Sequence, residues 1–471
     1  MQHISFQIFI LLTFCAAVAA QAVCMRFGRG FRSAERKAGT YRAGGGQGQS
    51  SKLPMTGGPV MIVMALAAGL VASRVYWSWP RGPWEIAVAL AGYGVVGFLD
   101  DFGKHRGRGL SQRLKTLGCL LVSGGVAASL CRVEFAEAFS VATVARWAVE
   151  TAFLFCFAVA ADFSDGVDGL AGGLGLAVCC AMGAAAILGH RAGASVWAIG
   201  VSVILAFLVF NLPSAWTSRG TARRRARVYL GDSGALAMGG GLAAAALWMH
   251  LGWVFIPAAA VWALEGFSSA WQAEFLVKLV YRRFGRVERY GKTPAPHTEF
   301  PLPLLAAPIH HHFEVAGWDR MQVWKLLMAT AVVCACGAAV TALFGVRMLV
   351  GYGIAGAACV ALWALAGIYR TFYLSVGDGG RLVLSSGLPF RLRGRRFHKV
   401  VRITELDAAG LTADQRMWLY RPMPRPDAME MLVRLLAGAG CADEARELAA
   451  TLPPAMRAMR LADVVLEEPA Q

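Results

Sequence analysis

Residues 147–169 read WAVETAFLFCFAVAADFSDGVDG, an apolar run that passes directly into three aspartates. A helix of about 20 mostly apolar residues spans the hydrocarbon core of a membrane. Because lipid offers no hydrogen-bond partners, a spanning segment must satisfy its own backbone groups, and this requirement favours a helix. The stretch therefore predicts a membrane helix whose polar end presents carboxylates at one membrane face.

Similar apolar runs recur along the whole chain. They lie near residues 4–23, 58–79, 84–100, 116–131, 147–162, 170–189, 194–212, 233–250, 253–280, 322–345 and 347–368. The chain is 57% hydrophobic and only 16% charged, a composition that excludes an ordinary soluble protein of 471 residues. The sequence predicts an all-α fold, a polytopic transmembrane bundle of about 10–11 helices over residues 1–370. Residues 371–471 are predicted to form a small cytoplasmic C-terminal appendix, with two or three short amphipathic helices over 426–466.

The net charge is +17, and the cations lie mainly between the apolar runs. Residues 104–115, 219–227 and 282–289 hold most of the Arg and Lys clusters, in loops that share one side when the spans alternate. Cytoplasmic loops carry such an excess, so the sequence predicts a multi-pass inner-membrane protein with its N-terminus outside. The first run resembles a signal peptide but lacks preceding positive charge, which favours a first membrane helix. No aromatic-interleaved basic motif occurs, so no nucleic-acid partner is expected.

Six aspartates fall at the predicted cytoplasmic ends of the spans. They are Asp100, Asp101, Asp162, Asp165, Asp168 and Asp232. A carboxylate beside a membrane span is costly, so by default it marks a functional site. Clustered carboxylates need a counter-ion, and Mg²⁺ commonly takes one or two carboxylates together with substrate phosphates and water. The pattern predicts a Mg²⁺-dependent phosphoryl-transfer site at the cytoplasmic face.

Each motif also has a purely structural interpretation. Residues 100–104 alone form a common helix end, residues 165–168 fit an Asx turn, and Asp232 fits a helix N-cap. The three histidines at 310–312 are compatible with zinc, but no Cys or HExxH partner lies nearby, so donors toward a pyrophosphate fit better. The shared placement of the acidic motifs on one side favours a function.

In chain order, these motifs match a known set. The matching segments are Gly97–Lys104, Gly109–Lys115, Ser164–Ala171, Asn211–Ala215, Gly231–Ala237, Leu264–Gln272 and Pro308–Trp318. Together they resemble the phospho-N-acetylmuramoyl-pentapeptide transferase family of the polyprenyl-phosphate N-acetylhexosamine-1-phosphate transferase superfamily. The resemblance implies transfer of phospho-MurNAc-pentapeptide from UDP-MurNAc-pentapeptide to undecaprenyl phosphate, which gives lipid I and UMP.

The resemblance also implies a Mg²⁺ cofactor bound with the help of Asp232. It implies Asp100, Asp101 and Asp232 as catalytic residues. The implied substrate-binding residues are Lys104, Asp165, Asp168, Asn211, Gln272, His310, His311 and His312. Whether Asp100 or Asp101 acts as a base stays open, because a lipid phosphate is already ionised at neutral pH and electrostatic positioning is the safer role. The implied partners are the two substrates and membrane lipid, and a homodimer is one alternative for the oligomeric state.

The chain departs from the family pattern at several places. Asp162 stands where the family usually has Asn, and residues 217–227, with five arginines, look inserted. Either Lys37 or Lys52 matches the family's nucleotide-binding lysine, and the last predicted span with the appendix is additional.

Two alternative functions remain. One is a sister enzyme that loads GlcNAc-1-phosphate or another amino-sugar phosphate onto the same lipid, which the PIHHHFE segment at 308–314 disfavours. The other is a non-catalytic scaffold or a transporter. A transporter places its ionisable residues near the membrane midplane, whereas these aspartates are predicted at one face.

Overall fold

The structure, a computed structural model, describes most of the chain in two compact units, and each is described by itself. The described residues are 2–27, 55–76, 83–105, 109–131, 140–189, 193–212, 226–272, 289–290, 293–294, 304, 306–316, 318, 320–344, 348–369, 371–377, 379–392, 395–421, 423, 425–452 and 461. The first unit contains the described residues of 1–36, 51–267 and 324–360, and the second those of 268–323 and 361–471. Lys37, Lys52 and most of the predicted 217–227 insertion lie outside the described residues.

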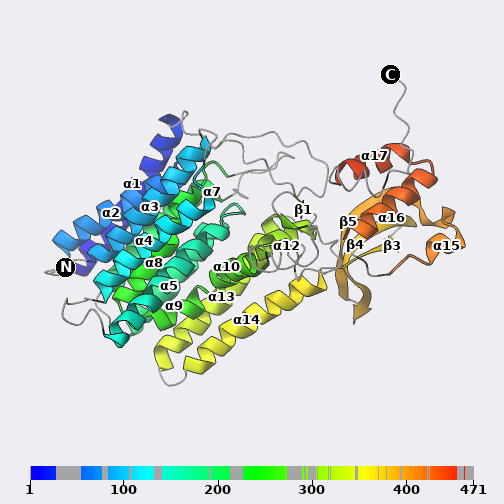
Figure 1. Ribbon diagram of the computed structural model, residues 1–471. Helices are drawn as coiled ribbons and strands as arrows, with labels where there is room; N and C mark the ends of the chain where they lie inside the picture. Colours follow the sequence, from blue (N-terminus) through cyan, green and yellow to red (C-terminus); the bar gives the residue numbers. More distant parts are fainter. Residues whose placement is uncertain are drawn as a thin grey trace. The chain divides into compact units, whose positions relative to one another are not determined.

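The first unit is helical, and some of its helices continue past its limits (Figure 1). The helices are α1 (Gln2–Phe27), α2 (Gly57–Val75), α3 (Trp84–His105), α4 (Gln112–Leu130), α5 (Val141–Phe163), α6 (Leu170–Leu188), α7 (Ala194–Asn211), α8 (Gly231–Trp248), α9 (Gly252–Ala258), α10 (Ala260–Ser269), α13 (Arg320–Phe344) and α14 (Met348–Ile368). Nine helices in the described part of the chain are long and apolar enough to cross a membrane, and α9 with α10 adds a tenth if counted as one bent span. The predicted polytopic helical bundle is confirmed.

Two helices begin earlier in the sequence than the apolar runs from which they were predicted, because a serine caps each helix at its N-terminus. Ser111 accepts a hydrogen bond from the backbone N–H of Leu114 and begins α4, and Ser140 accepts one from Thr143 and begins α5. Such a side chain satisfies a backbone donor that has no partner within the helix. Hydropathy alone therefore placed both starts a few residues too late.

The long segment predicted at 253–280, for which a tilted or a broken helix was expected, begins as the bent pair α9 and α10. The two helices meet at a bend of 71°. Pro257 lies inside α9, where it lacks a backbone donor and its ring clashes with the preceding turn. The proline accounts for the short first helix, and residues 273–280 lie outside the described part.

α8 lies against α2, α3 and α5, and most of its side chains are buried; it is drawn in green beside α3 and α5 in Figure 1. It confirms the helix predicted at 233–250, although Asp232 and its glycines keep its hydropathy below that of the nine candidate spans. Small residues let membrane helices approach closely. A Cβ on Gly58 would lie 2.4 Å from the backbone nitrogen of Gly234. Contacts with protein rather than lipid therefore surround this helix.

The second unit combines short helices with strands. Its elements are β1 (Arg289–Tyr290), β2 (Thr293–Pro294), α12 (Ile309–Val315), β3 (Phe372–Val376), β4 (Arg381–Leu392), β5 (Arg395–Asp407), the 3-10 helix η5 (Ala408–Gly410), α15 (Ala413–Arg416), α16 (Arg425–Gly438) and α17 (Ala442–Ala450). Strands β3, β4 and β5 form an antiparallel sheet in that order. The sheet packs against α16 and α17 around a buried apolar core. This core includes Leu374 and Leu382 from the strands and Leu432 and Leu448 from the two helices.

The short helices of the appendix confirm a prediction, whereas its sheet was not predicted. α16 and α17 fall within or close to the predicted 426–466 region. In β4, Ser385 and Ser386 are buried, and Ser386 donates to the carbonyl oxygen of Tyr369 at 3.1 Å. A strand is normally identified in a sequence by alternating apolar residues. Buried serines that form hydrogen bonds inside the fold interrupt this alternation, so the strand was not identified.

Candidate active site

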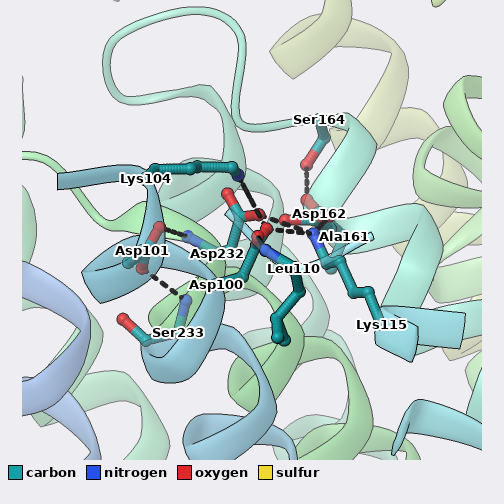
Figure 2. Close-up of polar contacts among 10 residues, drawn as sticks. All are labelled: Asp100, Asp101, Lys104, Leu110, Lys115, Ala161, Asp162, Ser164, Asp232 and Ser233. Atoms are coloured by element: carbon teal, nitrogen blue, oxygen red, sulfur yellow. Dashed lines mark hydrogen bonds and ion pairs between the residues drawn. The ribbon is translucent and has the colours of Figure 1, made fainter. Parts of the chain in front are cut away.

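The C-terminal end of α3 places the buried Asp101 beside the first turn of α8. Its two carboxylate oxygens accept hydrogen bonds from the backbone N–H groups of Asp232 and Ser233, at 3.2 and 3.0 Å. Backbone donors at a helix start have no partner within their own helix. Asp101 therefore caps α8 from a distant part of the chain and fixes the position of Asp232 (Figure 2).

Asp100, the other buried carboxylate of α3, is held by the loop that follows. One of its oxygens accepts from the backbone N–H of Leu110 at 2.8 Å, and the other lies 2.8 Å from the Lys104 ammonium. Lys104 is four residues further along the same helix, a spacing that brings the two side chains together. The DDFGK segment thus acts as a structured helix end rather than a frayed one.

Two lysines share the Asp232 carboxylate. Lys104 from α3 lies 2.6 Å from Oδ2, and Lys115 from α4 lies 2.5 Å from the same atom. Figure 2 shows the two lysines approaching that carboxylate from different sides. Such charge-assisted hydrogen bonds are shorter and stronger than neutral ones. Asp232 is the centre of this cluster.

Lys115 and Asp162 complete the cluster, although neither was predicted as an individual catalytic or binding residue. Lys115 lies 2.7 Å from Oδ2 of Asp162, at the end of α5, and 3.7 Å from Asp100. Both signals were present in the sequence, because Asp162 was placed among the acidic residues at this face and Lys115 within a matching motif. The cluster unites four carboxylates and two lysines from α3, α4, α5 and α8, so its carboxylates outnumber its ammonium groups.

Two glycines permit this arrangement. Gly231 begins α8 with a φ of 71°, a left-handed conformation that side chains disfavour. A Cβ at that position would also lie 2.6 Å from Oδ2 of Asp101. A Cβ on Gly97 would lie 2.4 Å from the backbone oxygen of Asp232. The absence of side chains at these two positions therefore sets the distance between the α3 and α8 carboxylates.

Asn211, predicted to bind substrate, ties three segments of the first unit together. Its Oδ1 accepts from the backbone N–H of Gly169 at 2.7 Å, and its Nδ2 donates to the carbonyl oxygen of Val228 at 2.8 Å. Nearby, Oδ2 of Asp168 accepts from the backbone N–H of Ala226 at 3.4 Å. Asp165 lies in the same turn, where its backbone N–H donates to the carbonyl oxygen of Asp162 at 3.2 Å. These bonds hold the turn after α5 against the segment before α8.

The remaining predicted residues belong to the second unit. Gln272 is buried and exchanges two hydrogen bonds with the backbone of Leu304, at 2.9 and 2.8 Å. The histidines lie on the short helix α12, where His310 and His312 are buried and His311 is partly exposed. The prediction that all three face substrate stays a prediction.

His311 has a carboxylate partner within α12. Its Nδ1 lies 2.8 Å from Oε2 of Glu314, which also pairs with Arg320 at 3.0 Å. Burial alone would raise the pKa of the Glu314 carboxyl, but the hydrogen bond with His311 and the nearby cationic groups outweigh it and lower that pKa. Glu314 therefore stays ionised and orients the His311 ring.

The donor chemistry of the aspartate cluster fits Mg²⁺. Its oxygens are hard ligands, and Mg²⁺ needs only one or two protein carboxylates when substrate phosphates and water supply the rest. Within the described ranges, no group of three or more His, Cys, Asp or Glu side chains is already arranged around a metal position. Lys104 and Lys115 both contact Asp232, so a cation would reach that carboxylate only after these ammonium groups move away.

The capping role of Asp101 leads to a testable expectation. Asp101→Asn replaces one acceptor oxygen with an NH₂ group, which leaves a buried backbone donor of α8 without its partner. We expect a loss of about 1–3 kcal/mol in unfolding free energy, measured as a lower midpoint of thermal unfolding of the purified protein. An unchanged midpoint would contradict the capping role and leave Asp101 only a chemical one.

Known proteins are similar to the part of the chain that contains the aspartate cluster. A family model described as glycosyl transferase family 4 matches residues 84–250, which include α3 to α8. A phospho-N-acetylmuramoyl-pentapeptide-transferase of Synechococcus elongatus is 30% identical over 291 residues, which cover 59% of this chain and 73% of the relative. A protein of the same name from Listeria welshimeri is 26% identical over 304 residues, which cover 61% of this chain and 85% of the relative.

Proposed function

Because this chain belongs to the phospho-N-acetylmuramoyl-pentapeptide-transferase family, we propose that it transfers phospho-MurNAc-pentapeptide from UDP-MurNAc-pentapeptide to undecaprenyl phosphate. The chain is a multi-pass membrane protein and a transferase of peptidoglycan synthesis. The proposed products are lipid I and UMP. The proposed location is the inner membrane. The aspartate cluster is proposed to face the cytoplasm, because loops rich in Arg and Lys lie on the cytoplasmic side of membrane proteins.

The observation that carries the proposal is the cluster around Asp232. Four helices bring carboxylates and ammonium groups within 2.5–3.7 Å of one another at one end of the bundle. Phosphoryl transfer between two anionic substrates depends mainly on positioning and on charge neutralisation. A cluster with both signs of charge supplies anchors for phosphate oxygens and for a divalent cation.

In the proposed reaction, an oxygen of the lipid phosphate attacks the phosphorus that carries the sugar. A new P–O bond forms there, and the bond to the bridging oxygen breaks, so UMP leaves with both electrons of that bond. A Mg²⁺ ion held with the help of Asp232 would neutralise charge on the pyrophosphate. Lys104 is half-exposed and long enough to move from Asp232 to a phosphate oxygen, whereas Lys115 is held deeper by Asp162. The buried Asp101 keeps Asp232 in place throughout.

Asp100 has little need to act as a base. A lipid phosphate is already ionised at neutral pH, so the attacking oxygen requires no deprotonation. The contacts of Asp100 with Leu110 and Lys104 instead support a role in holding the loop and the lysine. Electrostatic preorganisation of this kind is commonly the largest single contribution to catalysis.

A UMP-release assay with the purified full-length protein tests the proposed function. UDP-MurNAc-pentapeptide and UDP-GlcNAc would each be supplied with undecaprenyl phosphate, with Mg²⁺ and with chelator. We expect UMP and a lipid-linked product from the MurNAc substrate alone, and none with chelator. Turnover of UDP-GlcNAc alone would establish the sister activity instead, and no turnover of either substrate would support a scaffold.

A further inference from the structure

An apolar cavity of about 290 Å³ lies within the first unit, among α2, α3, α7 and α8. Its walls include Met61, Leu66, Leu90, Val203 and Leu242. Apart from Ser73 and the indole of Trp84, the described side chains that line it are apolar. Water would find few hydrogen-bond partners there, so an aqueous filling is unfavourable.

The cavity is separate from the aspartate cluster. On α3, Leu90 precedes Asp100 by ten residues, which corresponds to about 15 Å along a helix. On α8, Leu242 follows Asp232 by the same number of residues. The nearest lining residue on α8, Met238, follows Asp232 by six residues, about 9 Å along the helix, so the cavity begins beyond the aspartate cluster and extends away from it.

We propose that this cavity binds the hydrocarbon chain of a membrane phospholipid. Three of the four helices that line it are candidate membrane spans, so hydrocarbon is the solvent available to it. An apolar cavity of about 150 Å³ in a protein core binds benzene, and ligand pockets begin near 300 Å³. A chain of methylene groups supplies the dispersion contacts that an empty cavity of this volume lacks.

The residues at one end of the cavity favour a phospholipid over a polyprenyl chain. Trp84, 51% exposed, begins α3, and tryptophan is enriched where membrane meets water. Ser73 lines the cavity near the C-terminal end of α2, and Arg74 adds a cation to the same last turn, at the helix end where a lipid phosphate would lie. A lipid with its head group at this end inserts its chain directly, whereas the proposed polyprenyl substrate has its phosphate at the other end.

Filling the cavity with a side chain tests the proposal. Gly69 lines the cavity, and a Cβ at this position meets no heavy atom within 4 Å, so Gly69→Leu directs its side chain into open space. Gly125 in α4 offers the same open environment but does not line the cavity, which makes Gly125→Leu a matched control. Ala65→Phe fills the cavity from a neighbouring turn of α2 and replaces Gly69→Leu if that variant fails to elute as a folded protein.

The readout is photolabelling of the full-length protein in nanodiscs. The discs contain phosphatidylethanolamine with a diazirine in its acyl chain, or a diazirine-bearing undecaprenyl phosphate in a parallel sample, and labelled peptides are mapped by mass spectrometry. We expect phospholipid label on the lining residues of α2 and α3 in the wild type. The label should fall by at least about tenfold in Gly69→Leu and stay unchanged in Gly125→Leu.

Several results would overturn the proposal. They are an unlabelled lining in the wild type, equal labelling in folded Gly69→Leu, an equal loss in Gly125→Leu, and stronger labelling by the polyprenyl probe. Labelling requires no turnover, so these results do not depend on whether the proposed reaction is correct.

Discussion

Asp232→Ala should reduce UMP release by at least about a thousandfold, equivalent to roughly 4 kcal/mol of transition-state stabilisation. The substitution removes the carboxylate that both Lys104 and Lys115 contact, at 2.6 and 2.5 Å. It also removes the group proposed to hold Mg²⁺. The two ammonium groups would then repel each other at the centre of the site. The measurement is the initial rate of UMP release by purified protein at saturating Mg²⁺.

A control substitution separates this effect from a general response to losing an aspartate. Asp443 lies on α17, pairs with Arg446 at 2.7 Å and has a side chain that is 95% exposed. Asp443→Ala should leave the rate within about twofold, because exposed ion pairs contribute little. Membrane insertion and the elution profile of Asp232→Ala should match the wild type. Wild-type turnover by Asp232→Ala would remove Asp232 from the site.

Gly97→Ala is expected to have the second largest effect, through packing rather than chemistry. Its Cβ would lie 2.4 Å from the backbone carbon and oxygen of Asp232 and from the nitrogen of Ser233. Backbone atoms have no rotamer by which to move away, so α3 and α8 must separate. Overpacking of this kind typically costs about 1–3 kcal/mol, occasionally more. We expect a lower midpoint of thermal unfolding together with at least about a tenfold loss of UMP release, since Asp232 is displaced.

Gly125→Ala is the matched control for that substitution. It is also a helical glycine, and its added Cβ would meet nothing within 4 Å. Alanine is favoured over glycine within a helix by roughly 0.5–1 kcal/mol, so this variant should unfold at the same temperature or slightly higher. If Gly97→Ala behaved in the same way, close contact between α3 and α8 would not be what positions Asp232.

Hydropathy and charge were sufficient to predict the helical bundle. They did not predict the helix and strand boundaries that depend on polar side chains or on proline. Ser111 and Ser140 begin two helices earlier than the apolar runs indicated, and Pro257 lies near the break of the segment predicted at 253–280. The sheet of the appendix was missed because buried residues such as Ser385 are polar in sequence. In each case, a hydrogen bond or a close approach outweighed the hydrophobic pattern.

The candidate site was predicted in part. Asp100, Asp101, Lys104 and Asp232 were predicted together, and the structure places them in contact. Sequence alone did not show that Lys115 bridges Asp162 and Asp232. It also did not show that both carboxylate oxygens of Asp101 accept hydrogen bonds from the backbone of α8. Those facts depend on the crossing of helices far apart in sequence, which motif spacing does not encode.

Divalent-metal binding tests whether Asp232 and its neighbours form a phosphate and cation site. Mn²⁺ would replace Mg²⁺ in an electron paramagnetic resonance titration of the full-length protein in nanodiscs, with the UDP-linked substrate present. We expect one bound Mn²⁺ per chain, at least about tenfold weaker binding in Asp232→Asn, and unchanged binding in Asp443→Ala. Equal Mn²⁺ affinity in the wild type and Asp232→Asn would contradict this expectation.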